Sequence, residues 1–188
     1  KVSNLVFMGM GEPFLNYDNV LKAIDILNIE LGLNIAARKI VVSTIGIISG
    51  IEKFSQASKQ LRLAWALVSP FEQTRRQLIS YPGLPSIRET IVALAKYQSL
   101  TKRRITIEYV VLSGINDSIT DAEELAWIAR QLDSHINLIP YNTSPGSKFM
   151  RGKVQNMLAY LKNNGFNTTV RQSLGQEISA ACGQLAGK

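Results

Sequence analysis

Short apolar runs and longer amphipathic stretches alternate along this chain. Apolar residues at helical spacing, or bounded by helix start and stop signals, predict helices. Compact runs rich in β-branched residues predict strands. The predicted strands cover residues 4–9, 39–46, 61–69, 103–114, 135–142 and 166–173, and the predicted helices cover 17–32, 49–59, 72–80, 85–100, 118–133 and 153–165.

The segment 103–114 gives the clearest strand signal. Its apolar and aromatic positions alternate around Ile105, Ile107, Tyr109 and Val111, which is typical of a strand with one face in a core. Strands that alternate with helices predict parallel βαβ units. About six such units fit an open doubly wound α/β sheet or a partial (β/α) barrel, and both place ligands at the carboxyl ends of the strands.

Composition supports one globular unit. The chain has 188 residues, 46% of them hydrophobic, and a mean hydropathy of +0.05, which suits one core. We find no linker or repeat, and we therefore expect a single domain over 1–188. No apolar run reaches the roughly 18 residues of a membrane span, so we expect no membrane association.

Charge and cysteine content narrow the classes of partner and compartment. The 21 Lys and Arg outnumber the 14 Asp and Glu, a net charge of +7, which favours polyanions such as nucleic acid. The clusters "TKRR" (101–104) and "QTRRQ" (73–77) are typical of solvated faces. One cysteine and one histidine, His135, can form neither an internal disulfide nor a closed zinc site, and a reducing cytoplasm is expected.

Polar candidates follow several predicted strands. The first strand runs into "GMGEP" (9–13), where Gly11 allows a sharp turn and Glu12 offers a carboxylate for a ligand ammonium group. Ser43 ends the second strand, and Asn142 follows the fifth. Each of these residues alone is more often an ordinary loop residue, but several at one edge of a sheet predict a binding site.

Cys182 lies in "EISAACGQLAGK" (177–188). A buried structural thiol, a lost disulfide partner and a reactive nucleophile are all compatible with a lone cysteine. The small neighbouring residues predict a mobile loop, in which an accessible thiol suits nucleophilic chemistry.

Five segments together carry a family resemblance: "FMGMGEPFLNYDNV", "VVSTIGII", "RRITIEYVVLSGINDS", "NLIPYNTSPGS" and "AACGQLAG". In this order and spacing they resemble the radical S-adenosylmethionine (SAM) enzymes that methylate C2 of an adenine in 23S ribosomal RNA and in some tRNAs. A close relative of that family methylates C8 instead. The resemblance extends over nearly the whole chain.

The resemblance implies a partial (β/α) barrel and a role for each candidate. Gly11 and Glu12 match residues that hold the SAM amine, and Ser43 and Asn142 match further SAM contacts. Cys182 matches a cysteine that is methylated by a first SAM. A second SAM is then cleaved at a 4Fe–4S cluster, and the resulting radical activates that methyl group for transfer to the adenine. A second cysteine of the family resolves the protein–RNA link.

The chain departs from the family pattern in two ways. The cluster motif C-x-x-x-C-x-x-C and the resolving cysteine are absent, so we expect the first barrel strand and the cluster loop to lie upstream, and this chain alone to be inactive. The tripeptide Ala66-Leu67-Val68 stands where the family has Ser-Leu-His, which predicts weaker SAM contacts at that strand.

The resemblance predicts a cytoplasmic, monomeric RNA methyltransferase whose partners are 23S rRNA, tRNA and an electron donor such as flavodoxin. The main alternative is a non-catalytic RNA-binding relative that keeps the barrel, which Ala66 and Val68 favour and Glu12 and Cys182 oppose. A barrel enzyme that acts on a small molecule is a further alternative.

Overall fold

A computed structural model describes residues 2–57, 59–143 and 146–172. Its six strands are β1 (Leu5–Phe7), β2 (Ile40–Thr44), β3 (Arg62–Ala66), β4 (Ile105–Val111), β5 (Ser134–Pro140) and β6 (Thr168–Val170). Its α-helices are α1 (Tyr17–Asn28), α2 (Ile48–Ser55), α3 (Glu72–Leu78), α4 (Ile87–Thr101), α5 (Ile119–Arg130) and α6 (Val154–Asn163), with 3₁₀ turns η1 (Pro13–Asn16) and η2 (Ala37–Lys39). Each predicted segment overlaps an element of the predicted type, and the bounds of α2, α4 and β5 extend one residue beyond the predicted segments.

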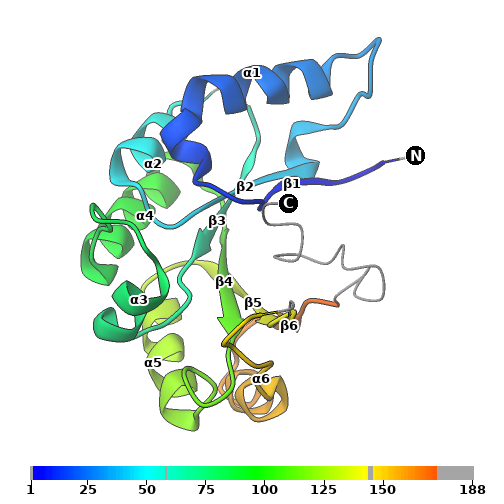
Figure 1. The fold of residues 1–188 in the computed structure, drawn as a ribbon. Helices are drawn as coiled ribbons and strands as arrows, with labels where there is room; N and C mark the ends of the chain where they lie inside the picture. Colours follow the sequence, from blue (N-terminus) through cyan, green and yellow to red (C-terminus); the bar gives the residue numbers. More distant parts are fainter. Residues whose placement is uncertain (1, 58, 144–145, 173–188) are drawn as a thin grey trace.

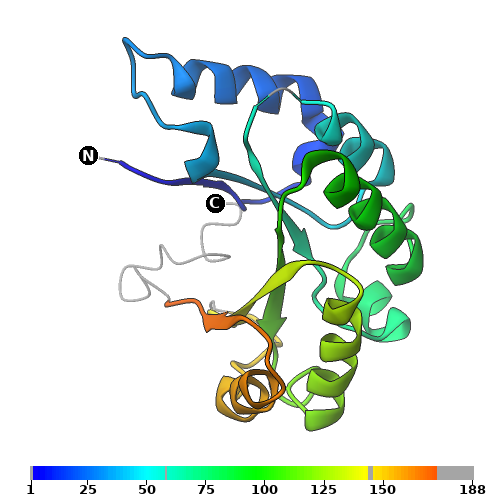
Figure 2. The ribbon, with the colours of Figure 1, turned by 180° about the vertical axis from the view of Figure 1, so that it is seen from behind.

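The strands form one parallel sheet in the order β1-β2-β3-β4-β5-β6. The helices form an arc around one side of this sheet, and the opposite, concave side faces away from them (Figures 1 and 2). A doubly wound sheet reverses its strand order and carries helices on both faces. The sequential order and the one-sided helices therefore define a partial (β/α) barrel.

The alternation predicted for 103–114 is confirmed in β4. Ile105, Ile107, Tyr109 and Val111 are fully buried in the hydrophobic core, on the face that the outer helices cover. Because successive side chains of a strand point to opposite faces, Glu108 lies on the concave face. The two-residue alternation that buries one face of β4 in the core thus places the Glu108 carboxyl group inside the barrel.

Helix α1 ends earlier than its pattern predicts. The apolar spacing predicts a helix to residue 32, but the helix stops at Asn28, and Ile29 has an extended ψ of 130°. Leu31 is 99% exposed, so no core contact stabilises the last predicted turn.

Among the described helices, none has both the length and the apolar character that a membrane span needs.

Candidate cofactor-binding site

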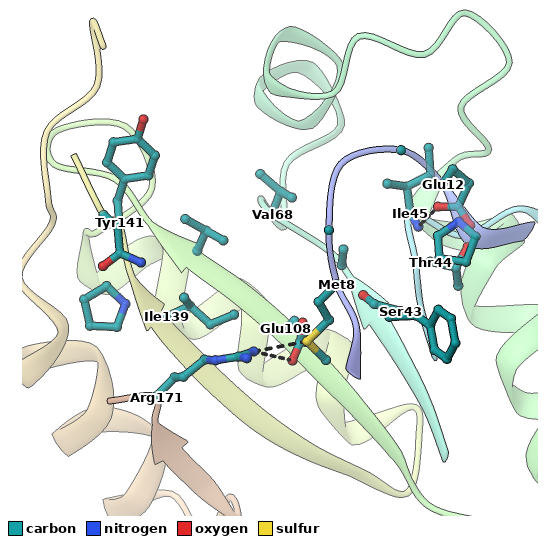
Figure 3. Close-up of a pocket in the computed structure, with 18 residues that line it drawn as sticks. Met8, Glu12, Ser43, Thr44, Ile45, Val68, Glu108, Ile139, Tyr141 and Arg171 are labelled. Atoms are coloured by element: carbon teal, nitrogen blue, oxygen red, sulfur yellow. Dashed lines mark hydrogen bonds and ion pairs between the residues drawn. The ribbon is translucent and has the colours of Figure 1, made fainter. Parts of the chain in front are cut away.

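A pocket of about 270 Å³ opens at the carboxyl ends of the strands (Figure 3). Its lining comes from the loops after β1 and β5, from the carboxyl end of β2, from β3 and β4, and from the residue that follows β6. The lining includes Met8, Gly11, Glu12, Ser43, Ile45, Ala66, Val68, Glu108, Tyr141, Asn142 and Arg171. Six of the seven residues predicted to contact a cofactor therefore meet at one pocket.

Glu12 braces the loop that follows β2. Its Oε2 accepts a hydrogen bond from the Ile45 backbone N–H at 2.8 Å, and its Oε1 accepts one from the Phe14 N–H at 3.0 Å. The second bond caps η1. Each carboxylate oxygen can accept more than one hydrogen bond, so the half-buried carboxylate still offers acceptor capacity to a ligand in the pocket. Glu12 thus joins two loops and carries negative charge to their junction.

The same Ile45 peptide is held from its other side by Arg75. Arg75 is completely buried, although the run "QTRRQ" predicts a solvated face, and that expectation is wrong for this residue. Its Nη2 donates to the Ile45 carbonyl at 2.6 Å and its Nη1 donates to the Pro85 carbonyl at 2.7 Å. Burial lowers the pKa of Arg75 to about 10, which leaves it cationic at neutral pH. The carboxylate of Glu12 and this guanidinium therefore fix the position of one pocket-lining peptide.

The tripeptide after β3 divides between pocket and core. Ala66 and Val68 line the pocket, whereas Leu67 is fully buried in the core. Val68 has a φ of +65°, which is unfavourable for a β-branched residue. The Asn116 side-chain amide, itself completely buried, donates to the Val68 carbonyl at 2.7 Å and holds this conformation. The wall at β3 is consequently apolar, and its shape is held by a hydrogen bond from a neighbouring loop.

Two charged residues that the sequence reasoning missed lie inside the pocket. Glu108 is 7% exposed, and its Oε1 lies 3.8 Å from Nη1 of Arg171, which comes after β6 (Figure 3). Arg171 Nη1 also lies 3.1 Å from the Met8 sulfur. Burial raises the pKa of Glu108, while Arg171 and the Asn137 amide oppose that rise. A lone acid inside a strand with no other charged residue, "ITIEYVV", was the available signal.

The loop after β5 supplies the opposite wall. Asn142 is 5% exposed at the pocket. The neighbouring Tyr141 hydroxyl lies 2.7 Å from the Ser147 hydroxyl, and its ring meets the edge of Phe149 with centroids 6.1 Å apart. These contacts support the segment that presents Asn142 to the pocket.

The described residues contain neither the predicted nucleophile nor a cluster of metal ligands. Cys182 lies outside the described residues, so its proposed role stays a prediction. Within the described part of the chain, no group of three His, Cys, Asp or Glu side chains is arranged to hold a metal ion. The described residues therefore offer no ligand set for an iron–sulfur cluster.

Comparison with known proteins gives strong similarity over the whole chain, although no protein-family profile matches it. The chain is 44% identical over 187 residues to a ribosomal RNA large subunit methyltransferase N from Nitrosopumilus maritimus, covering 98% of this chain and 53% of that protein. It is 44% identical over 191 residues to a probable dual-specificity RNA methyltransferase RlmN from Caldicellulosiruptor saccharolyticus, covering 100% and 56%. A crystal structure of a radical SAM methyltransferase from Sphaerobacter thermophilus superposes with a TM-score of 0.92 at 42% identity, covering 98% of this chain and 55% of that one.

The partial barrel thus has the fold of this radical SAM methyltransferase over 98% of the chain. The chain spans about half the length of the curated relatives that it matches. Over its own whole length, it is a homologue of the RlmN-type RNA methyltransferases.

Proposed function

We propose that this chain is the SAM-binding part of a cytoplasmic, monomeric RNA methyltransferase that modifies adenine C2 in 23S rRNA, in tRNA or in both. One observation carries the proposal: Gly11, Glu12, Ser43 and Asn142, which are far apart in the sequence, line one pocket at the carboxyl ends of the strands. Ligand sites of (β/α) barrels occur at this edge.

The residues at the pocket fit SAM by charge and polarity. Glu12 places a carboxylate where a methionine ammonium group can donate hydrogen bonds, and Gly11, with a φ of +92°, turns the chain with no atom within 4 Å of where a Cβ would lie. Ser43 and Asn142 add neutral polar groups. The bound cofactor supplies the methyl group, and in radical SAM chemistry it is also the source of the radical. The apolar groups of Ala66, Val68 and Ile139 limit the water that can enter beside it.

For methyl transfer we propose Cys182 as the carrier. Its thiolate, after loss of a proton, would take a methyl cation equivalent from the sulfonium of SAM and form a thioether, which leaves S-adenosylhomocysteine. A thiolate is a strong nucleophile toward such carbon centres. The cluster and the flavodoxin-type electron donor belong to the complete enzyme, whose relatives are about twice as long as this chain.

Isothermal titration with SAM tests the pocket. We expect one binding site, and we expect Glu12→Gln to weaken SAM binding about 10- to 100-fold, because a hydrogen bond between charged groups contributes roughly 1.5–3 kcal/mol. Glu52→Gln, on the exposed face of α2, is the matched control: its carboxylate pairs with Lys96 away from the pocket, and we expect unchanged affinity. Equal SAM affinity in the two variants would contradict the assignment of Glu12.

The apolar end of β3 favours one other function. Because Ala66 and Val68 offer only apolar contacts to the pocket, a non-catalytic RNA-binding relative would keep the barrel without SAM. Absence of any SAM binding heat, together with retained RNA binding, would select this function over the methyltransferase.

A further inference from the structure

A second cavity, of about 460 Å³, lies at the opposite end of the strands. Four arginines line it: Arg38 from η2, Arg62 at the first position of β3, and Arg103 and Arg104 just before β4. His135, near the start of β5, completes the group. Because the strands are parallel and sequentially ordered, their amino ends meet here, and the segments at the starts of β2, β3 and β4 bring their arginines to the same edge.

Most of this positive charge is not neutralised by the protein. Arg104 pairs with Asp133, with Nε and Oδ1 2.8 Å apart. Arg103 donates to the Lys59 carbonyl at 2.8 Å, a neutral acceptor. Arg38 and Arg62 are exposed, and among the described residues neither has a carboxylate within ion-pair distance.

The remaining partners at this edge add no further negative charge to the cavity. The His135 ring nitrogens lie 3.0 Å from Asn167 Oδ1 and 2.8 Å from Thr169 Oγ1, both neutral. Asp25 is paired with Lys59. Like charges that line one cavity repel one another, so a bound polyanion would relieve an unfavourable field.

We propose that this arginine-lined cavity binds phosphate groups of the RNA backbone, as a second contact surface remote from the SAM pocket. Guanidinium groups match phosphate geometry through paired hydrogen bonds. RNA is the polyanion that we choose because the homologues are named RNA methyltransferases. The choice of RNA as the ligand therefore rests on the proposed function, although none of the residues that line this cavity lines the SAM pocket.

The fold sets the length of RNA that this contact requires. Strands β4 and β5 have seven residues each, so at roughly 3.3 Å per residue the two ends of the sheet are about 23 Å apart. An oligonucleotide of a few residues in the pocket cannot also reach the arginines. A folded tRNA is long enough to contact both ends.

Salt-dependent RNA binding tests the surface. We would measure binding of a tRNA transcript, and of a short single-stranded oligonucleotide containing adenine, between 50 and 300 mM KCl. The test variant is Arg38→Ala with Arg62→Ala. The matched control is Arg88→Ala with Lys162→Ala, which removes the same charge from exposed positions on α4 and α6. Far-UV circular dichroism checks that each variant is folded.

Two lost phosphate contacts lower the slope of log K against log salt by about 1.4 to 1.8, which corresponds to roughly 25- to 60-fold weaker tRNA binding at 0.1 M salt. We expect this loss for the test variant with tRNA, and a smaller loss with the short oligonucleotide, which offers fewer phosphates to the cavity. Equal tRNA affinity of the two double variants would overturn the inference, as would failure of the unsubstituted protein to bind tRNA. SAM titration of the same protein reports on the proposed function separately.

Discussion

Removal of Arg75 tests how the pocket is held together. The substitution Arg75→Met keeps an unbranched side chain of moderate length but deletes the donors to the carbonyls of Ile45 and Pro85, at 2.6 and 2.7 Å. A buried acceptor without a partner costs about 1–3 kcal/mol. Ile45 and Pro85 are only half-buried, so we take the lower part of that range, which gives about 2–4 kcal/mol for the two carbonyls together.

Part of that cost is offset, because the variant no longer buries a guanidinium. Within the described residues, Nε of Arg75 has no hydrogen-bond partner, and burying an imperfectly paired charge is unfavourable. We therefore expect a net loss of about 2 kcal/mol in the free energy of unfolding, or a decrease in Tm of about 4–8 °C for a domain of this size. Urea unfolding followed by circular dichroism measures the loss.

A second measurement separates local from global effects. Leu161→Ala removes core packing on the buried face of α6, which follows β5, whereas Arg75 lies in α3, which follows β3. We expect this change to lower the free energy of unfolding by about 2–5 kcal/mol. We expect SAM affinity to fall in Arg75→Met but not in Leu161→Ala, because only the former releases the Ile45 peptide. An Arg75→Met protein as stable as the unsubstituted one, or an equal loss of SAM affinity in both variants, would refute the reasoning.

Two further predictions concern packing and pH. Gly50→Ala in α2 should destabilise the fold by about 1–3 kcal/mol, since its Cβ would overlap the Phe14 side chain; thermal unfolding beside the exposed-site control Ser49→Ala would show whether the two differ. Burial raises the pKa of Glu108 despite Arg171, so the folded state binds that proton more tightly and stability falls as pH rises from the ordinary glutamate range to the folded pKa. Glu108→Gln should lack this contribution, so its stability relative to the unsubstituted protein should increase from pH 4 to pH 7 in urea titrations; a constant difference would contradict the raised pKa.

Local patterns were sufficient to predict the elements. Apolar spacing and strand alternation depend on which side chains can be buried together, and this period is visible in the sequence, as Ile105 and Ile107 show in β4. The positions of Glu12, Ser43 and Asn142 at or after the ends of predicted strands also predicted that they would meet, since parallel strands share one carboxyl edge. Their roles as SAM contacts remain proposals.

The tertiary structure decided what no local pattern contains. Strand order selected the partial barrel over the doubly wound sheet. It brought Arg171 against Glu108, residues 63 positions apart, because β4 and β6 lie on either side of β5 in the sheet. It also separated two arginine clusters that look alike in sequence: Arg75 is buried as a structural cation, whereas Arg104 lines an open cavity. A run of charged residues in the sequence shows where charge lies along the chain. Whether each side chain is buried depends on the distant segments that pack against it.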